Sequence, residues 1–195
     1  MKVANISLWV SLVFLVLAGV AFVATSRAGY ETARYEVVKK DGNFEVRDYE
    51  PLVVVTTPMT GDAQNQSFGR LFKYISGGNT GEQKIEMTTP VFMPATSEGN
   101  SAEMQFVVPA SVAKSGAPNP ADPSVKLAKM SGGKYAALRY SGRSTEAERN
   151  EKLAELRVKL SDLDLESSGN AIFAGYDPPW TPAPMRRNEV LLKLK

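Results

Sequence analysis

The order of the predicted elements constrains this fold most strongly, because the same order occurs twice along the chain. Each half contains two strand patterns, one amphipathic helix pattern and two more strand patterns. A segment rich in proline, alanine and serine, residues 110–124, separates the halves and predicts a surface loop. The predicted strands are 44–49, 52–57, 84–91 and 104–108 in the first half, and 125–130, 134–140, 171–176 and 189–194 in the second.

A β-β-α-β-β unit cannot cover its own apolar face, so the two units are expected to pack against each other as a pseudo-symmetric pair. The chain has 195 residues, of which 43% are hydrophobic, and this suits one ordinary globular domain. We therefore predict an α+β fold with a mostly antiparallel sheet and two outer helices. A further strand, 36–40, is joined to the first unit by Asp41-Gly42, a dipeptide typical of two-residue hairpin turns.

The two helices have different sequence signals. The first is predicted over Ser67–Ser76, with Asn65 as a candidate N-cap and Gly77-Gly78 as its end, because glycine enters the left-handed conformation at low cost. Its apolar residues have the i, i+3, i+4, i+7 spacing of one helix face: Phe68, Leu71, Phe72 and Ile75. The second helix follows a capping box, and its apolar stripe predicts scaffold: Thr145 and Glu148, then Leu153, Leu156 and Leu160.

Residues 1–28 form an N-terminal leader in which an uncharged run, Val3 to Ser26, lies between Lys2 and Arg27. The run is closer in length to a membrane-spanning helix than to the apolar part of a signal peptide, which favours an uncleaved membrane anchor through residues 3–26. The end of the leader also fits a small-x-small cleavage site, so a cleaved signal peptide is the alternative. Both place residues 29–195 outside the cytoplasm, at the cell membrane if anchored, or periplasmic or secreted if cleaved.

Composition excludes several classes of function. The chain has no cysteine and no histidine, which excludes disulfides, cysteine nucleophiles, Ser-His pairs and zinc sites made of nitrogen and sulfur ligands. Of its 23 basic residues, two lie in the leader, which leaves 21 against 21 acidic residues in 29–195. This balance argues against nucleic-acid binding. No G-x-S-x-G elbow or phosphate-binding loop occurs, so we do not expect an enzyme.

Four segments together resemble the SOUL/haem-binding protein family: Asn43–Pro51 (NFEVRDYEP), Lys73–Asn79 (KYISGGN), Lys84–Val91 (KIEMTTPV) and Gly175–Val190, which contains GYDPPW and RRNEV. The resemblance runs from about Tyr35 to Leu194 and identifies residues 29–195 as a SOUL-like haem-binding domain. It implies a distorted antiparallel β-barrel of two similar halves, each with an outer helix. It also implies non-covalent binding of haem or a related tetrapyrrole in a shallow apolar cleft beside the first helix.

The segments that match the family's cleft helix and C-terminal closing loop are Ser67–Ser76 and Asp177–Arg187. Haem has two apolar faces and two propionates, so its site needs flat apolar area with cations at one edge. The candidate walls are Met59, Phe68, Leu71, Phe72 and Trp180, and the candidate propionate partners are Arg70, Lys73, Arg186 and Arg187. At least two of Phe68, Leu71 and Phe72 are expected in the core rather than in the cleft.

The sequence leaves the metal ligand unknown. Histidine has been proposed as the axial ligand in some members of the family, and this chain has none. Met185 and Tyr176 are the site residues that could approach the iron.

We interpret the chain as a non-enzymatic haem or tetrapyrrole carrier, scavenger or buffer. One alternative is a small-molecule effector-binding or interaction module of the same fold, with little preference for haem over other flat hydrophobic or cationic ligands. An enzyme that works with a carboxylate such as Glu86 or Glu189 is a third hypothesis, and no sequence motif favours it.

Overall fold

The structure is a computed structural model that describes residues 29–59, 64–96 and 102–195. The predicted leader, residues 1–28, lies outside the described residues. Within the described ranges, none of the helices has the length and apolar character needed to cross a membrane.

The first half of the chain contains β1 (Glu31–Thr32), β2 (Tyr35–Asp41), β3 (Phe44–Tyr49), β4 (Leu52–Pro58), α2 (Gln64–Ile75), β5 (Thr88–Thr89), β6 (Val91–Pro94) and β7 (Glu103–Val107). The second half contains α3 (Ala110–Ser115), β8 (Lys126–Met130), β9 (Gly133–Tyr140), α4 (Glu146–Asp162), β10 (Ser167–Gly175), the short 3₁₀ helix η1 (Ala183–Met185) and β11 (Asn188–Leu194). The predicted α+β class is therefore confirmed.

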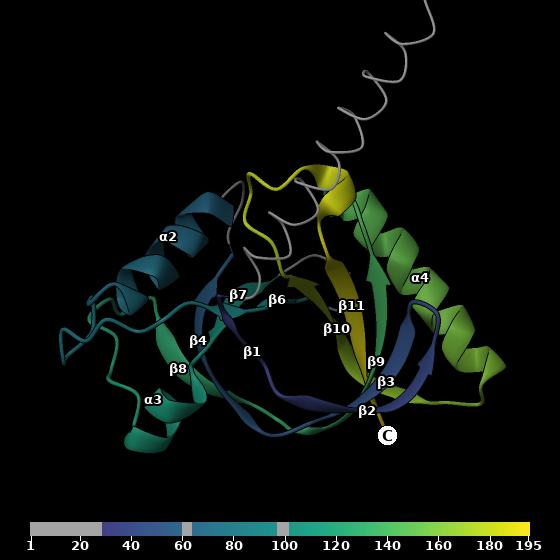
Figure 1. Cartoon of the computed structure of the whole chain (residues 1–195), viewed down its shortest axis with the longest axis horizontal. Helices are drawn as coiled ribbons and strands as arrows, with labels where there is room; N and C mark the ends of the chain where they lie inside the picture. Colours follow the sequence, from purple (N-terminus) through teal and green to yellow (C-terminus); the bar gives the residue numbers. More distant parts are fainter. Residues whose placement is uncertain (1–28, 60–63, 97–101) are drawn as a thin grey trace, which may run out of the picture.

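Nine strands form one antiparallel sheet in the order β2-β3-β9-β11-β10-β6-β7-β4-β8, while β1 and β5 form a separate parallel pair. The sheet curves strongly, and α2 and α4 lie outside it on opposite sides (Figure 1). In the described sheet, β2 and β8 are the two edges and are not hydrogen-bonded to each other. The sheet is therefore open, and the closed barrel that the resemblance implies is not seen.

The strand order has the symmetry expected of two similar units. With β2 left out, the order is symmetric about its centre. The strands β3, β9, β11 and β10 on one side correspond to β8, β4, β7 and β6 on the other. The centre is the pairing of β10 with β6, from Ile172 opposite Pro94 to Gly175 opposite Val91. Each unit also gives its first strand to the other, because β3 pairs with β9 and β8 pairs with β4.

Three apolar clusters fill the molecule. The predicted scaffold helix α4 begins at the capping box of Thr145 and Glu148 and buries its leucine stripe against β3, β9, β10 and β11. The helix α2 covers β4 and β7 and forms a second cluster with residues such as Phe106. The third cluster lies on the sheet face opposite α4 and includes Phe92 and Leu191. Both faces of β11 are therefore covered, and six of its seven residues are buried.

Two predicted boundaries in the first half are wrong by one residue or more. The hairpin turn is Gly42–Asn43, because Asp41 still belongs to β2 and pairs with Phe44. Gly42, with φ of 59°, takes the first turn position rather than the second. Asn65 does not cap the first helix, since it lies inside α2 after Gln64.

Two longer segments also differ from their predictions. Within 84–91 only β5 and the first residue of β6 are strand, and Pro90 separates them. Ile85 and Met87 nevertheless both pack against the α2 cluster, as their alternation predicts. The predicted loop 110–124 contains the short helix α3.

Candidate functional site

Two aromatic rings lie exposed side by side on α2. Phe68 and Phe72 are 37% and 52% exposed, and their rings are stacked with centroids 6.1 Å apart and planes inclined by 14°. Phe68 also meets the buried ring of Phe106 edge-on, at 5.2 Å between centroids. The pair is therefore supported from beneath while its outer surface is open to a ligand.

The buried face of α2 includes two polar residues, and this orientation of the helix leaves the rings of Phe68 and Phe72 exposed. Ser67 and Tyr74 are both buried. The Ser67 hydroxyl donates to the carbonyl of Pro58 at 3.0 Å, and the Tyr74 hydroxyl donates to the carbonyl of Pro118 at 2.9 Å. These bonds satisfy the polar atoms that burial would otherwise leave unpaired. The expectation that two of the residues Phe68, Leu71 and Phe72 belong to the core is wrong, since only Leu71 is buried.

Bare backbone lies next to the ring pair. Gly69 is exposed inside α2, and a Cβ placed on it would have no atom within 4 Å. Met59, at the end of β4, is half-buried and packs against both helix-covered clusters. Leu71 is fully buried and does not line this surface. The exposed apolar face therefore consists of Phe68, Gly69 and Phe72, and we call it the α2 face.

The two cations of α2 have different surroundings. Arg70 donates from Nε to the hydroxyl of Thr57 at 2.9 Å and from Nη2 to the carbonyl of Pro58 at 2.7 Å, so it ties α2 to the end of β4. Lys73 is exposed. Of the four predicted propionate partners, Lys73 alone makes no side-chain hydrogen bond within the part of the chain that the structure describes. It is therefore the cation best placed to meet a ligand carboxylate.

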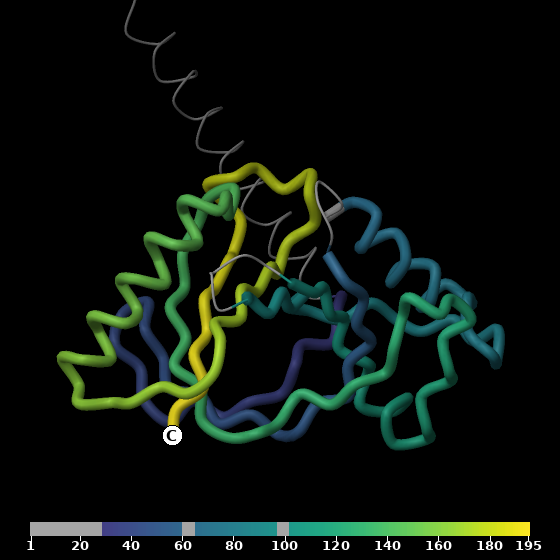
Figure 2. Tube along the Cα trace, turned by 180° about the vertical axis from the view of Figure 1, so that it is seen from behind, coloured from purple at the N-terminus to yellow at the C-terminus, as the bar shows by residue number. Residues whose placement is uncertain are grey.

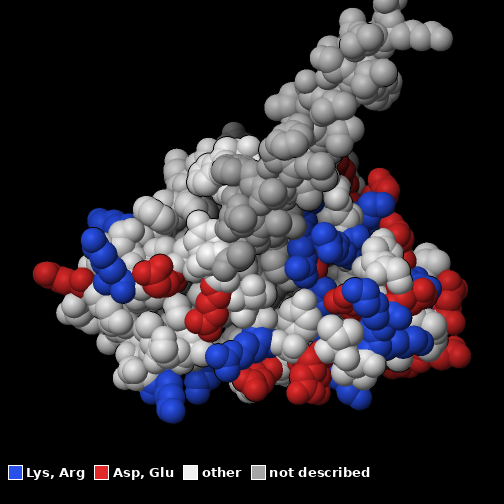
Figure 3. All heavy atoms as spheres, in the orientation of Figure 1, with Lys and Arg blue, Asp and Glu red and all other residues white. Residues whose placement is uncertain are grey.

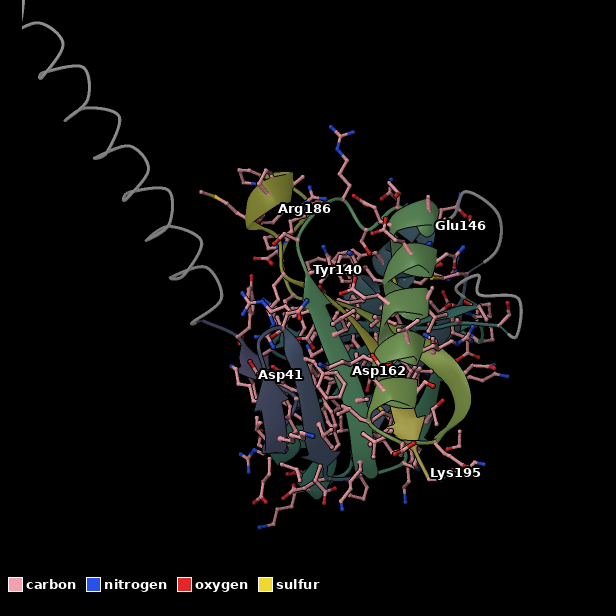
Figure 4. The ribbon with its side chains drawn as sticks, turned by 90° about the vertical axis from the view of Figure 1, so that its right-hand side faces the viewer. Asp41, Tyr140, Glu146, Asp162, Arg186 and Lys195 are labelled. Atoms are coloured by element: carbon pink, nitrogen blue, oxygen red, sulfur yellow. The ribbon has the colours of Figure 1, made fainter. Side chains whose placement is uncertain are left out.

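The loop 177–187 crosses the top of the molecule between α4 and α2 (Figure 2). Its Trp180 is 71% exposed. Arg186 folds back inside the loop, where it donates to the carbonyl of Thr181 at 2.8 Å and to that of Pro179. In Figure 4 the labelled Arg186 lies beyond Tyr140, at the same end of the molecule as Glu146. This arginine therefore braces the loop and is not free for a propionate.

A buried charged network holds the base of this loop. Glu189 in β11 is fully buried and accepts the hydroxyl of Tyr176 at 2.8 Å and Nη2 of Arg187 at 2.6 Å. Arg47 in β3, 2% exposed, donates to both carboxylate oxygens of Glu189, at 2.6 and 2.9 Å. Tyr35 completes the network by facing the Arg47 guanidinium at 4.4 Å and accepting from Arg187 at 3.4 Å.

Burial and charge have opposite effects in this network. Burial by itself would raise the pKa of Glu189, but the hydrogen bonds and charges of Arg47 and Arg187 outweigh it and keep that pKa below its usual value. Burial raises the pKa of Tyr176 well above its usual value, so the phenol stays protonated and donates to the carboxylate. Tyr176 is 5% exposed and occupied by Glu189, so it is not open to a ligand iron.

The described residues contain no group of three or more acidic side chains that could hold a metal ion. Met185 lies in η1 and is half-buried.

A hollow of about 670 Å³ lies away from α2, at the ends of β2 and β3, and is lined by residues 33–36 and 48–50. Its charged side chains are Glu36, Asp48 and Glu50 against Arg34, a net negative set that disfavours a ligand with two carboxylates. In the view of Figure 3, charges of both signs cover the lower surface of the molecule. The α2 face is therefore the better candidate for an apolar dianion.

Comparison with known proteins gives a relationship over nearly the whole described chain. The model of the SOUL heme-binding protein family matches residues 30–193. Heme-binding protein 1 of Sus scrofa is 30% identical over 163 residues, which are 79% of this chain and 85% of that protein. Heme-binding protein 1 of Xenopus tropicalis is 29% identical over 162 residues, covering 78% of this chain and 84% of that protein.

Solved structures share the fold at low identity. The C-terminal domain of EcmrR has a TM-score of 0.57 at 10% identity, over 83% of this chain and 98% of that one. A hydrolase from Listeria innocua has a TM-score of 0.56 at 12% identity, over 81% and 94% of the two chains. These likenesses show the fold alone, whereas the family match and the curated relatives show descent: the chain belongs to the SOUL heme-binding protein family.

Proposed function

We propose that this protein binds haem or a related tetrapyrrole non-covalently, on the α2 face. The observation that carries the proposal is the exposed, stacked pair of Phe68 and Phe72 beside the bare backbone of Gly69. Stacked rings and bare backbone form a flat apolar surface of the kind that a porphyrin face requires. Family membership and the names of the curated relatives support this ligand class.

Charge and loop placement support the same ligand. Lys73 follows Phe72 on the exposed side of α2 and can meet a propionate at the edge of the ring system. Trp180, on the loop 177–187, can add a second aromatic surface. Without histidine, no imidazole is available to the iron. Burial of the porphyrin and pairing of its propionates are then the main sources of affinity.

We further propose a carrier, scavenger or buffer role outside the cytoplasm. The uncharged run of residues 3–26 supports attachment to the cell membrane, or export if the leader is cleaved. The likeness to a hydrolase at 12% identity concerns the fold only, and the described chain has no catalytic motif.

The test is a haemin titration of the full chain in mild detergent, followed by the Soret band. The variant is Phe68→Ala/Phe72→Ala, and the matched control is Val37→Ala/Val38→Ala, which truncates two apolar side chains of β2 that are at least as exposed, 50% and 55%. Burying the exposed half of one phenylalanine, about 100 Å², contributes about 2 kcal/mol. Each ring removed should therefore weaken binding by about tenfold or more.

The result can contradict the proposal in two ways. If haemin does not bind saturably at one per chain, the effector-binding or interaction module becomes the preferred function. If the control pair weakens binding as much as the ring pair does, binding is not localised on α2.

A further inference from the structure

The loop that carries Trp180 is joined at its base to a distant strand. Its flanking residues are Tyr176 and Arg187: the amide of Tyr176 donates to the carbonyl of Arg187 at 3.1 Å, and the Arg187 guanidinium lies 3.9 Å from the Tyr176 ring centre. Asp177 closes the base by accepting the amide of Arg187 at 2.6 Å. Both flanking side chains then bind one carboxylate, that of Glu189.

That carboxylate is oriented from β3, which does not neighbour β11. The strand order places β9 between them. Arg47 lies opposite Tyr135 of β9, and Glu189 lies opposite Arg139 of the same strand. The residue of β9 midway between Tyr135 and Arg139, on the same face of the sheet, is Ala137. Ala137 is 1% exposed, and its small side chain leaves room for the guanidinium to reach across β9.

The geometry restricts the carboxylate more than a single ion pair would. Arg47 uses two nitrogens on the two oxygens of Glu189, the bidentate arrangement that fixes orientation as well as distance. Each oxygen also accepts from a second residue, Oε2 from the hydroxyl of Tyr176 and Oε1 from the guanidinium of Arg187. A buried ion pair is weak support for stability, and its best-attested benefit is a unique geometry.

We propose that Arg47 is a positioning residue for the ligand site: through Glu189 it fixes the base of loop 177–187 and so holds Trp180 in place for the ligand. The effect on ligand binding rests on the proposed function, whereas the fixing of loop 177–187 by Arg47 does not. Arg47 itself does not touch the ligand surface, since it is 2% exposed and lies under Tyr35.

The test uses Trp180 as the reporter. The chain has two tryptophans, Trp9 and Trp180, so the full chain with Trp9→Phe reports on Trp180 alone. In this background we compare the parent with Arg47→Met/Glu189→Met, which removes the two charges of the fully buried pair together. Glu45 keeps its ion pair with Lys40, and Arg187, whose side chain is 21% exposed, loses its carboxylate partner but reaches solvent. The fluorescence anisotropy decay of Trp180, recorded without haem, measures the local motion of the loop.

The double variant should keep its far-UV circular dichroism and show at least a twofold larger amplitude of fast Trp180 motion. Haemin affinity should fall about fivefold to tenfold. Unchanged Trp180 motion in the folded double variant would overturn the proposal. Increased motion with unchanged haemin affinity would overturn its link to the ligand site, while a parent that does not bind haemin refutes the proposed function alone.

A second pair of variants covers the case in which the double variant does not fold. Tyr176→Phe removes one hydroxyl bond from the network, and Tyr135→Phe removes one from a buried tyrosine on the same sheet face, whose hydroxyl donates to the carbonyl of Ser131 at 2.9 Å. Each variant removes one hydroxyl bond of a buried tyrosine, and the loss at the charged acceptor Glu189 should cost more stability than the loss at the Ser131 carbonyl. The proposal requires faster Trp180 motion in Tyr176→Phe only.

Discussion

Gly69→Ala is expected to stabilise the protein and at the same time weaken haem binding. Gly69 lies in the interior of α2, and an added Cβ would meet no atom within 4 Å, so the methyl group causes no clash. Alanine loses less backbone entropy than glycine in a helix, which contributes about 0.5–1 kcal/mol. For a chain of this size the melting temperature should rise by about 1–4 °C.

The same methyl group would stand beside the Phe68–Phe72 pair, where a flat ligand would approach the helix backbone. A gap of about 0.5–1 Å forfeits roughly a quarter to a half of the dispersion energy of each affected contact. We therefore expect haemin affinity to fall severalfold in Gly69→Ala, although the protein is more stable.

The assay is thermal unfolding by circular dichroism together with a haemin titration of the same sample. Asn150→Ala is the matched control, because Asn150 is exposed in α4 and alanine is also the better helix former there. The control should raise the melting temperature without changing haemin affinity. An affinity that is unchanged or increased in Gly69→Ala would refute the assignment of the ligand to the α2 face.

Three further predictions concern stability. Gly78→Ala should destabilise the protein by about 1–3 kcal/mol in urea unfolding. The added Cβ would lie 2.7 Å from the carbonyl oxygen of Lys73, which accepts the Gly78 amide at 2.8 Å. An unchanged urea midpoint would contradict this prediction. Glu189 has a folded pKa below its usual 4.5, so its contribution to stability is complete above pH 4.5 and is lost as the pH falls through the folded value; a urea midpoint that rises on acidification would be inconsistent with a charged network. Thr145→Ala should cost about 1 kcal/mol, because it removes the side-chain acceptor of the Glu148 amide, and thermal unfolding would show a loss of a few degrees.

Local patterns predicted the elements that carry their own signals. The capping box of Thr145 and the leucine stripe of α4 are complete in a short stretch of sequence, and the structure confirms both. Gly77 and Gly78 also end the first helix as predicted: the Gly78 amide bonds back to Lys73, and Gly77 takes a φ of 109°. Such features depend on neighbours in the sequence and can be read without the fold.

The site depends on contacts that local patterns do not contain. The apolar spacing of α2 suggested a buried face that includes Phe68 and Phe72, but hydrogen bonds of Ser67 and Tyr74 to distant carbonyls turn the helix and expose the rings. Arg186 and Arg187 were predicted as propionate partners, yet loop carbonyls and Glu189 occupy them.

The buried network was missed for a similar reason. Arg47 and Glu189 are 142 positions apart in the sequence and lie on strands that are not neighbours in the sheet. Arg47 stands among other charged residues in its strand pattern, Glu45 and Asp48, and Glu189 is one of two in its own, so no local signal marks the two as a buried pair.

The exchange of first strands between the two units has a consequence for cutting the chain. A break within 110–124 would leave an N-terminal piece without β8, the partner of β4, and a C-terminal piece without β3, the partner of β9. Each piece would expose unpaired strand edges, which readily bind other strands. The two pieces should therefore behave as complementing fragments that restore the sheet only together, so that a duplicated architecture folds as one cooperative body.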